Sequence, residues 1–334
     1  MPTKPRVAVL YQACEPPIVN GVRKPKRPGG YRDSGSDIAY VLHSKDQVEV
    51  ITPDQDPDQK RDDGWCFPDT ESGILEAIDR GADTLWANTI LFASHPLQTS
   101  PALDSHAARV RVVAQPPRFV ERYDDKNWVN DLLREKGTFK LPRSWMVNSS
   151  SHIELLALPY PIVGKPIRGR GSHGVKVCRS ASDLSKHLTF LVEESPTVML
   201  EEYLSGQEAT VTVMPPSEDH PDYYSLPLVV RFNHEHGIAP YNGVVAVTAN
   251  SRVLLQDEQA SNPRYEEIST ACEGVARLLR VTAPIRIDVR QATDQKDSHF
   301  AIFDVNMKPN MTGPGRPGRE DQASLTAMAA RSLG

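Results

Sequence analysis

Two short segments near the end of the chain place acid or amide groups on apolar, strand-like runs. One run carries Arg286 and Asp288, and the other, within residues 300–312, carries Asp304 and Asn306. Residues two apart on a strand project to the same side. The three oxygen donors could therefore converge on one point, as Mg²⁺ requires when it also holds phosphates. Arg286 would add a fixed positive charge there. The alternative is a pair of ordinary core strands with solvated acidic ends.

A glycine-rich loop lies between two apolar runs at residues 162–178. Lys165 precedes the loop and can reach phosphate oxygens, and Ser172 can donate to them. The sequence is not a P-loop, because GxxxxGK[ST] is absent, and a strand rather than a helix is expected to follow it. A plain flexible turn is the alternative. Three glycines free the backbone to fold over an anion: Gly169, Gly171 and Gly174.

A third segment, residues 198–210, would end a strand beside this hairpin. Glu201, Tyr203 and Leu204 could present backbone amides and a carboxylate to a purine edge, and Glu208 could bind ribose hydroxyls. Taken alone, the segment is better explained as a strand and loop with surface acids.

Strand-like and helix-like segments alternate over the first third of the chain, which predicts an α/β domain with a doubly wound parallel sheet. We assign residues 1–117 to this domain, 118–205 to a central domain and 206–334 to a third. The expected strands are Val7–Tyr11, Val48–Thr52, Thr84–Trp86, Val110–Ala114, Ser144–Val147, Ile162–Lys165, Val175–Cys178, Val198–Glu201, Ala209–Val213, Leu226–Phe232, Val244–Thr248, Ile285–Val289 and Phe300–Val305. The expected helices are Ser36–Ser44, Ser72–Arg80, Asn127–Lys136, Ser182–Glu193, Pro263–Arg280 and Glu320–Leu333.

Composition narrows the class of protein. The 334 residues, 39% hydrophobic and 24% charged, are typical of a globular protein with two or three domains. A net charge of −5 argues against a nucleic-acid partner. No signal peptide or membrane-length apolar run is visible. The four cysteines are scattered without a CxxC pair, which fits free thiols in a reduced compartment. We therefore expect a cytoplasmic protein with no membrane partner.

These pieces, in this order, resemble the ATP-grasp superfamily, and most closely its D-alanine–D-alanine ligase branch. The resemblance spans about Lys126 to Thr312. It rests on Lys165-Pro166 with the loop to Gly174, on Glu201–Glu208, on Arg286–Val289 and on Asp304–Thr312. It implies the ATP-grasp fold: an N-terminal doubly wound sheet, a central α+β lid domain and a C-terminal mixed-sheet domain.

The resemblance also implies roles for particular residues. Lys126 and Lys165 match lysines that contact nucleotide phosphate, Glu201, Tyr203 and Leu204 match the adenine segment, and Glu208 matches the ribose acid. Asp288, Asp304 and Asn306 match the Mg²⁺ ligands, and Arg286 matches the arginine that stabilises the acyl transition state. Ser172, beside Gly171, matches a serine of the lid loop, so the loop would close as a lid over the site.

The implied reaction activates a carboxylate with the γ-phosphate of ATP, giving an acylphosphate, ADP and then a bond to an amine. The expected cofactors are ATP and two Mg²⁺ ions, for which Mn²⁺ can substitute. Phosphoryl transfer depends mainly on positioning and charge neutralisation, which fits this set of residues. A homodimer is expected from the resemblance alone.

The chain departs from the family pattern at several positions. Asp304 replaces a glutamate at the bridging metal position, and Asn310 replaces a glycine whose N–H helps form the oxyanion hole. Asparagine tolerates unusual backbone angles, so that role can survive. The serine that holds the acceptor carboxylate has no visible counterpart; Arg316, within the Gly- and Pro-rich run that follows Thr312, could grip that carboxylate instead.

Two loops could set the choice of substrate. The family's glutamate for the first substrate's amino group is not visible, and a long insert, residues 15–33, stands in its place. Its basic residues could favour a carboxylate-rich substrate, or the loop could simply be solvated, and D-alanine is not expected as the substrate. In residues 233–243, His236 or Tyr241 could contact the substrate. A zinc site built on His234 and His236 is the alternative, but the third and fourth ligands that zinc needs are not evident.

Three functions remain after this reasoning. The first is an ATP-dependent carboxylate–amine ligase acting on an amino acid or small peptide. The second is a small-molecule kinase on the same fold, which would leave the phosphate on its product. The third is a nucleotide-binding regulatory protein without turnover, against which the complete set of charged residues argues.

Overall fold

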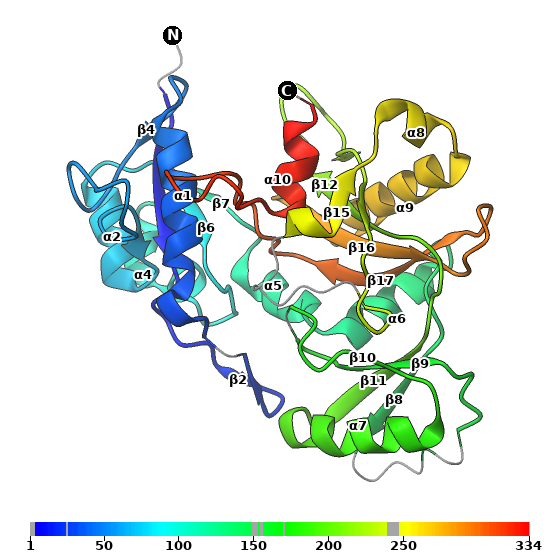
Figure 1. The fold of residues 1–334 in the computed structure, drawn as a ribbon. Coiled ribbons are helices and arrows are strands. Elements are labelled where there is room, and N and C mark those ends of the chain that lie inside the picture. Colours follow the sequence, from blue (N-terminus) through cyan, green and yellow to red (C-terminus); the bar gives the residue numbers. More distant parts are fainter. Residues whose placement is uncertain are drawn as a thin grey trace. The chain divides into compact units, whose positions relative to one another are not determined.

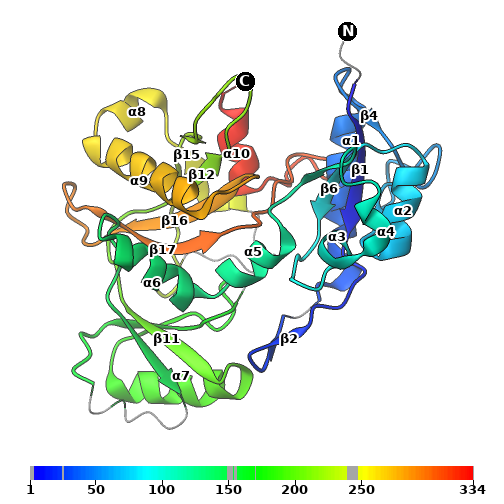
Figure 2. The same ribbon diagram turned by 180° about the vertical axis from the view of Figure 1, so that it is seen from behind.

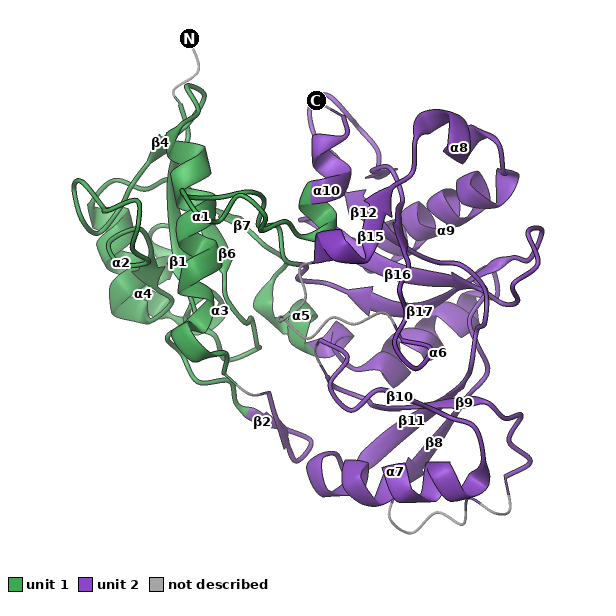
Figure 3. Ribbon diagram, viewed as in Figure 1, with its two compact units in different colours: residues 1–17, 25–121, 310–327 green, residues 18–24, 122–309, 328–334 purple. Residues whose placement is uncertain are grey.

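The computed structural model describes residues 4–24, 26–148, 153, 156–169, 171–238 and 247–333. The chain divides into two compact units (Figure 3). Unit 1 contains residues 1–17, 25–121 and 310–327, and unit 2 contains residues 18–24, 122–309 and 328–334. The predicted boundary near residue 117 lies close to the change of unit, whereas part of the third predicted segment, residues 310–327, belongs to unit 1.

Unit 1 is built on a parallel sheet with the strand order β4-β1-β6-β7, in which β5 also pairs with β1. Helix α1 packs on β1 and β4, and helix α2 packs on β5 (Figure 1). The parallel pairing confirms the predicted doubly wound sheet. The strands are β1 (Arg6–Tyr11), β4 (Glu49–Val50), β5 (Phe67–Pro68), β6 (Thr84–Asn88) and β7 (Arg111–Val113). The helices are η1 (Pro28–Tyr31), α1 (Arg32–His43), α2 (Glu71–Asp79), α3 (Pro96–Thr99), α4 (Pro101–Asp104) and most of α5 (Pro117–Tyr123).

Local chemistry explains where these elements begin. The side chain of Thr70 caps α2 by accepting a hydrogen bond from the Gly73 N–H at 3.2 Å. The buried face of α2 carries Ile74, Ala77 and Ile78, which join β1 residues in one hydrophobic cluster.

The first part of unit 2 holds a four-stranded antiparallel sheet in the order β10-β9-β11-β8. Helix α7 packs along β9, β10 and β11, and Figure 2 shows it beside β11. Leu184, Leu188 and Leu191 of α7 enter the core of this sheet. The strands are β8 (Ser144–Asn148), β9 (Ile162–Pro166), β10 (Lys176–Cys178) and β11 (Thr197–Glu202), and the helices are α6 (Lys126–Lys136) and α7 (Ala181–Glu194).

The second part of unit 2 is an antiparallel sheet in the order β15-β14-β12-β16-β17, with β13 paired to β12. Helix α9 lies against β12, β13, β16 and β17 through a buried stripe that includes Ile268, Cys272, Val275 and Leu279. The strands are β12 (Glu208–Met214), β13 (Tyr224–Ser225), β14 (Val229–Arg231), β15 (Ser251–Val253), β16 (Ile285–Gln291) and β17 (Phe300–Asn306). The helices are η3 (Val247–Ala249), α8 (Gln256–Ala260) and α9 (Pro263–Leu279), and α10 (Leu325–Arg331) begins in unit 1 and ends in unit 2.

Two local predictions need correction. The expected strand Val244–Thr248 is wrong where it can be checked, because residues 247–249 form a 3₁₀ helix and the strand lies at Ser251–Val253; residues 244–246 lie outside the described residues. The insert at residues 15–33 holds an unpredicted hairpin of β2 (Ile18–Val19) and β3 (Val22–Arg23). Asn20 and Gly21 both have positive φ at its turn, and Asn-Gly between apolar residues is a recognised hairpin signal.

Candidate active site

The two acidic strands lie side by side as β16 and β17. Their antiparallel register places Asp288 opposite Asp304 and Arg286 opposite Asn306. Opposite residues on one face have Cβ atoms about 5 Å apart. The structure therefore brings together the three oxygen donors and the arginine that the sequence placed at one point.

Each carboxylate of this group has a cationic neighbour. Both oxygens of Asp288 accept hydrogen bonds from Arg286, at 3.0 and 2.8 Å, and Oδ1 also accepts from the Thr210 hydroxyl. The ammonium of Lys126, at the start of α6, lies 3.0 Å from Asp304 Oδ1. The positive and negative groups are thus interleaved along one face of the sheet.

The Lys126–Asp304 pair is strongly favoured in its charged form. Burial alone would raise the pKa of Asp304, but Lys126 and Lys165 outweigh it and hold the pKa below its ordinary value. Burial would likewise lower the pKa of Lys126, yet Asp304 and Asp124 raise it above the ordinary value. Both groups are therefore charged at neutral pH.

Lys165 is buried between the two sheets of unit 2. Its ammonium donates to the Phe303 carbonyl at 2.9 Å and lies 2.6 Å from Glu201 Oε2. Glu201 also accepts from Asn130 at 3.1 Å. The carboxylate of Glu201 thus holds Lys165 in place. The purine-contacting role expected of the strand end around Glu201 stays a prediction.

The residues predicted for the base and ribose lie together. Glu208 starts β12 and lies directly opposite Arg290 of β16. Arg290 lies 3.5 Å from Glu208 and donates to the Tyr203 hydroxyl at 3.1 Å. Leu204 is half-buried beside Tyr203. His234 Nε2 lies 2.9 Å from Glu208 Oε2.

The glycine-rich hairpin is confirmed as a β9–β10 turn, with Lys176 opposite Gly164. Gly171, Ser172 and Gly174 all have positive φ, between 56° and 70°. For Ser172 this left-handed conformation is uncommon. The turn leaves Gly171 exposed and Ser172 half-buried, and Arg170 lies outside the described residues.

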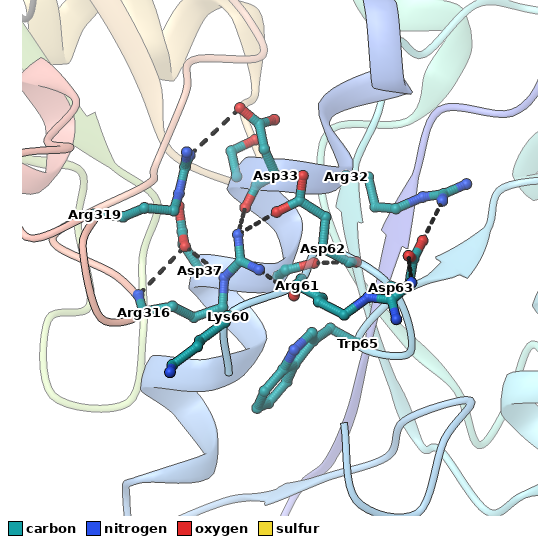
Figure 4. Close-up of polar contacts among 12 residues, drawn as sticks. Arg32, Asp33, Asp37, Lys60, Arg61, Asp62, Asp63, Trp65, Arg316 and Arg319 are labelled. Atoms are coloured by element: carbon teal, nitrogen blue, oxygen red, sulfur yellow. Dashed lines mark hydrogen bonds and ion pairs between the residues drawn. The ribbon is translucent and has the colours of Figure 1, made fainter. Parts of the chain in front are cut away.

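Arg316 has surroundings different from those expected of a substrate contact. In Figure 4 it lies against α1, where its Nε donates to Asp37 at 2.9 Å and its Nη2 lies 2.5 Å from Asp62. Only 1% of Arg316 is exposed. Because these acids and the Arg61 carbonyl already occupy its guanidinium, we do not carry the substrate role forward.

Three further predicted site residues are Asn310, His236 and Tyr241. Asn310 accepts at Oδ1 from the Thr312 N–H at 2.9 Å, and it is not among the described residues with positive φ. His236 is exposed, and Tyr241 lies outside the described residues. Two basic residues of the 15–33 insert have partners within unit 1: Lys26 donates to the Ala13 carbonyl at 3.0 Å, and Arg27 donates to Asp33 at 3.0 Å.

Sequence reasoning missed two features. Arg290 gave no local signal, because its partners come from distant segments. Ser324 lies beyond the motif that ends at Thr312, yet its N–H donates to the Thr312 carbonyl at 2.7 Å. A buried serine therefore follows Thr312 in space, although not in sequence.

The described residues contain neither a metal centre built from His, Cys and carboxylates nor a membrane span. Within the described parts of the chain, no group of three or more His, Cys, Asp or Glu side chains is arranged to hold a metal ion. The predicted Mg²⁺ set is of another kind, since one of its ligands is an asparagine. None of the described helices has the length and apolar content of a membrane span.

A parallel domain followed by two antiparallel sheets that carry opposed lysines and acids is the ATP-grasp fold, and solved structures bear this out. A D-alanine–D-alanine ligase from Bacillus anthracis complexed with ATP superposes with a TM-score of 0.64 at 18% identity, covering 98% of this chain and 92% of that one. The VanG D-Ala:D-Ser ligase from Enterococcus faecalis gives 0.61 at 13%, covering 99% of each.

The chain belongs to the D-Ala–D-Ala ligase family, whose C-terminal domain model matches residues 137–316. Among curated relatives, a D-alanine–D-alanine ligase of Aquifex aeolicus is 27% identical over 175 residues, 52% of each chain. D-alanine–D-alanine ligase A of Bacillus cereus is 25% identical over 215 residues, 63% of this chain and 62% of the relative. The chain thus matches little more than half of these relatives' length.

Proposed function

We propose that the protein is an ATP-dependent carboxylate–amine ligase. The observation that carries this proposal is the cross-strand pairing of Asp288 with Asp304, flanked by Arg286 and Lys126. The arrangement offers oxygen donors for a divalent cation, a cation for phosphate and an arginine beside a developing oxyanion. Membership of a family whose curated members are D-alanine–D-alanine ligases supports the same chemistry.

The proposed reaction has two steps. A carboxylate oxygen of the first substrate attacks the γ-phosphorus of ATP, the bond to the β-γ bridging oxygen breaks, and ADP leaves. The amine of the second substrate then attacks the acyl carbon, loses a proton and expels phosphate. Arg286 would offset the oxyanion charge. The turn that holds Ser172 would exclude water from the acylphosphate.

The donor set fits Mg²⁺. Two carboxylates and the Asn306 amide oxygen are hard ligands, and Mg²⁺ completes its shell with water and substrate phosphates. Asp288, Asp304 and Asn306 would hold the ion, which supplies charge neutralisation for the phosphates when bound. We propose two ions and that Mn²⁺ can replace them.

The substrate is proposed to be an amino acid or small peptide other than D-alanine. This rests on the insert at residues 15–33, which stands where the family's glutamate for the first substrate's amino group is expected, and on the Gly- and Pro-rich run after Thr312, which stands where the serine for the acceptor is expected. Ser324 is proposed to hold the acceptor carboxylate in place of Arg316, and a Ser324→Ala variant should raise the KM of the acceptor. A homodimer, proposed from the resemblance, is testable by light scattering.

Phosphorus NMR of ATP turnover tests the proposed function. The protein is incubated with Mg²⁺, ATP and a mixed pool of amino acids, dipeptides and hydroxylamine. The ligase predicts ADP and free phosphate only when the pool is present. A new phosphorylated product without free phosphate would instead support the small-molecule kinase, and ATP binding without any turnover would favour a regulatory protein.

A further inference from the structure

We infer that Arg290 is a positioning residue for the nucleotide, holding Tyr203 and Glu208 where the base and ribose would bind and fastening the loop of residues 233–238 over them. The inference rests on the proposed function, because Tyr203 and Glu208 are the residues assigned there to the nucleotide. It adds two residues, Arg290 and His234, to which the sequence pattern gave no such role.

Arg290 is buried and its guanidinium is bonded on every side. Nε donates to the Gly206 carbonyl at 3.0 Å, Nη1 to the Gly237 carbonyl at 2.8 Å and Nη2 to the Tyr203 hydroxyl at 3.1 Å. The guanidinium carbon also lies 4.9 Å from the centroid of the Tyr203 ring, within the range of a cation–π contact. One side chain therefore joins two segments, at residues 203–206 and at Gly237, that are both far from it in the chain.

The position of Arg290 on β16 links it to the reacting end of the site. Because successive side chains of a strand alternate between its two faces, residues 286, 288 and 290 share one face. Across the β12–β16 pair, Arg290 lies directly opposite Glu208, with 3.5 Å between Nη1 and Oε2. A guanidinium holds such a planar set of acceptors in a fixed fork, which an ammonium cannot reproduce.

The loop of residues 233–238 is fastened to the same residues. His234 Nε2 lies 2.9 Å from Glu208 Oε2, and Arg290 holds the Gly237 carbonyl. Gly237 has a φ of 89°, and a Cβ built on it would lie 2.9 Å from the Tyr203 hydroxyl. Glycine is therefore required for this close approach. The described part of the loop thus lies on Tyr203 and Glu208, the residues assigned to the nucleotide.

Loss of Arg290 should weaken nucleotide binding without changing the chemical step. Glu208 would lose its buried cation and Tyr203 its fixed partner, so the base and ribose contacts would no longer be preorganised. Because such contacts act equally before and during phosphoryl transfer, KM for ATP should rise while kcat stays nearly constant. We expect Arg290→Gln to raise the Kd of ATP about tenfold or more.

The test is isothermal titration calorimetry, in which the non-hydrolysable ATP analogue AMP-PNP, together with Mg²⁺, is titrated into each of four proteins. These are the natural protein, Arg290→Gln, Arg290→Lys and the control Arg134→Gln. Arg134 is a half-buried arginine of unit 2 that donates to Pro142, Ser144 and Asp131, at 3.0, 2.8 and 3.4 Å, rather than to Tyr203 or Glu208. Both Arg290 variants should bind weakly, whereas the Arg134 variant should lose melting temperature but keep its affinity.

The outcomes separate the inference from the proposed function. If the natural protein does not bind the analogue, the proposed function fails. If it binds, and Arg290→Gln binds equally well, the positioning role of Arg290 is overturned. Should Arg290→Gln not fold, Tyr203→Phe removes only the hydroxyl that accepts from Arg290. It should raise Kd about two- to fivefold, and an unchanged Kd in that variant overturns the inference equally.

Discussion

Replacing Arg316 by methionine should destabilise unit 1 strongly, although the residue lies in the Gly- and Pro-rich run after Thr312. Arg316 and Asp37 are each 1% exposed, and the two side chains are joined at 2.9 Å. Removing one partner of a buried ion pair leaves the other charge uncompensated, which costs about 3–5 kcal/mol. Arg319 still holds Asp37 Oδ2 at 2.6 Å, so we expect the lower end, about 3 kcal/mol. That corresponds to a fall in melting temperature of about 10 °C for a unit of this size.

Urea unfolding followed by tryptophan fluorescence measures this effect, since Trp65 is buried beside the cluster (Figure 4). The matched control is Arg61→Met. Arg61 and its partner Asp63 are 68% and 56% exposed, so this loss should cost less than about 1 kcal/mol. If Arg316→Met unfolds at the same urea concentration as the control, the ion pairs of Arg316 with Asp37 and Asp62 do not stabilise unit 1. If it stays stable but raises the KM of the acceptor, the substrate role for Arg316 would be restored.

Two further predictions concern other charged groups. Asp69 accepts from the Ala13 and Cys14 N–H groups, both at 2.7 Å, and from His95 and Thr89; these bonds outweigh burial and lower its pKa. Its stabilisation is therefore present above the unfolded pKa of about 3.9 and lost as pH falls through the lower folded value. Acid unfolding curves should show Asp69→Asn less stable at pH 7 and less dependent on pH below 4, and parallel curves would contradict this. Asp304→Asn should lower Mg²⁺-dependent turnover by about 10²-fold or more, and it should also lower the melting temperature because Lys126 loses its partner; full activity at saturating Mg²⁺ would remove Asp304 from the metal site.

The elements that position the site could be predicted because their signals are local. Apolar runs and alternation located β16 and β17, and the period of two put Asp288 with Arg286 and Asp304 with Asn306. The register that sets Asp288 against Asp304 needed the structure, because strand pairing is a long-range choice. The Asn20-Gly21 turn signal is present in the sequence, but it lies within a polar insert whose composition favours a loop.

Side chains whose partners are far away in sequence could not be predicted. Arg316 was given a substrate role from its place after Thr312, yet its partner Asp37 is 279 residues away. Arg290 looked like an ordinary strand residue, because Tyr203 and Gly237 reach it from separate loops. Buried arginines of this kind become visible only when the packing that buries them is known.

The central claim is that a carboxylate is activated as an acylphosphate, and oxygen-isotope transfer tests it most directly. The protein is given Mg²⁺, ATP and a carboxylate substrate, found in the pool experiment, whose carboxyl oxygens are ¹⁸O. Because the amine expels phosphate together with the former carboxylate oxygen, each inorganic phosphate should carry one ¹⁸O when it is analysed by mass spectrometry. Phosphate without ¹⁸O, released at the same rate as the amide, would contradict the acylphosphate and with it the proposed mechanism.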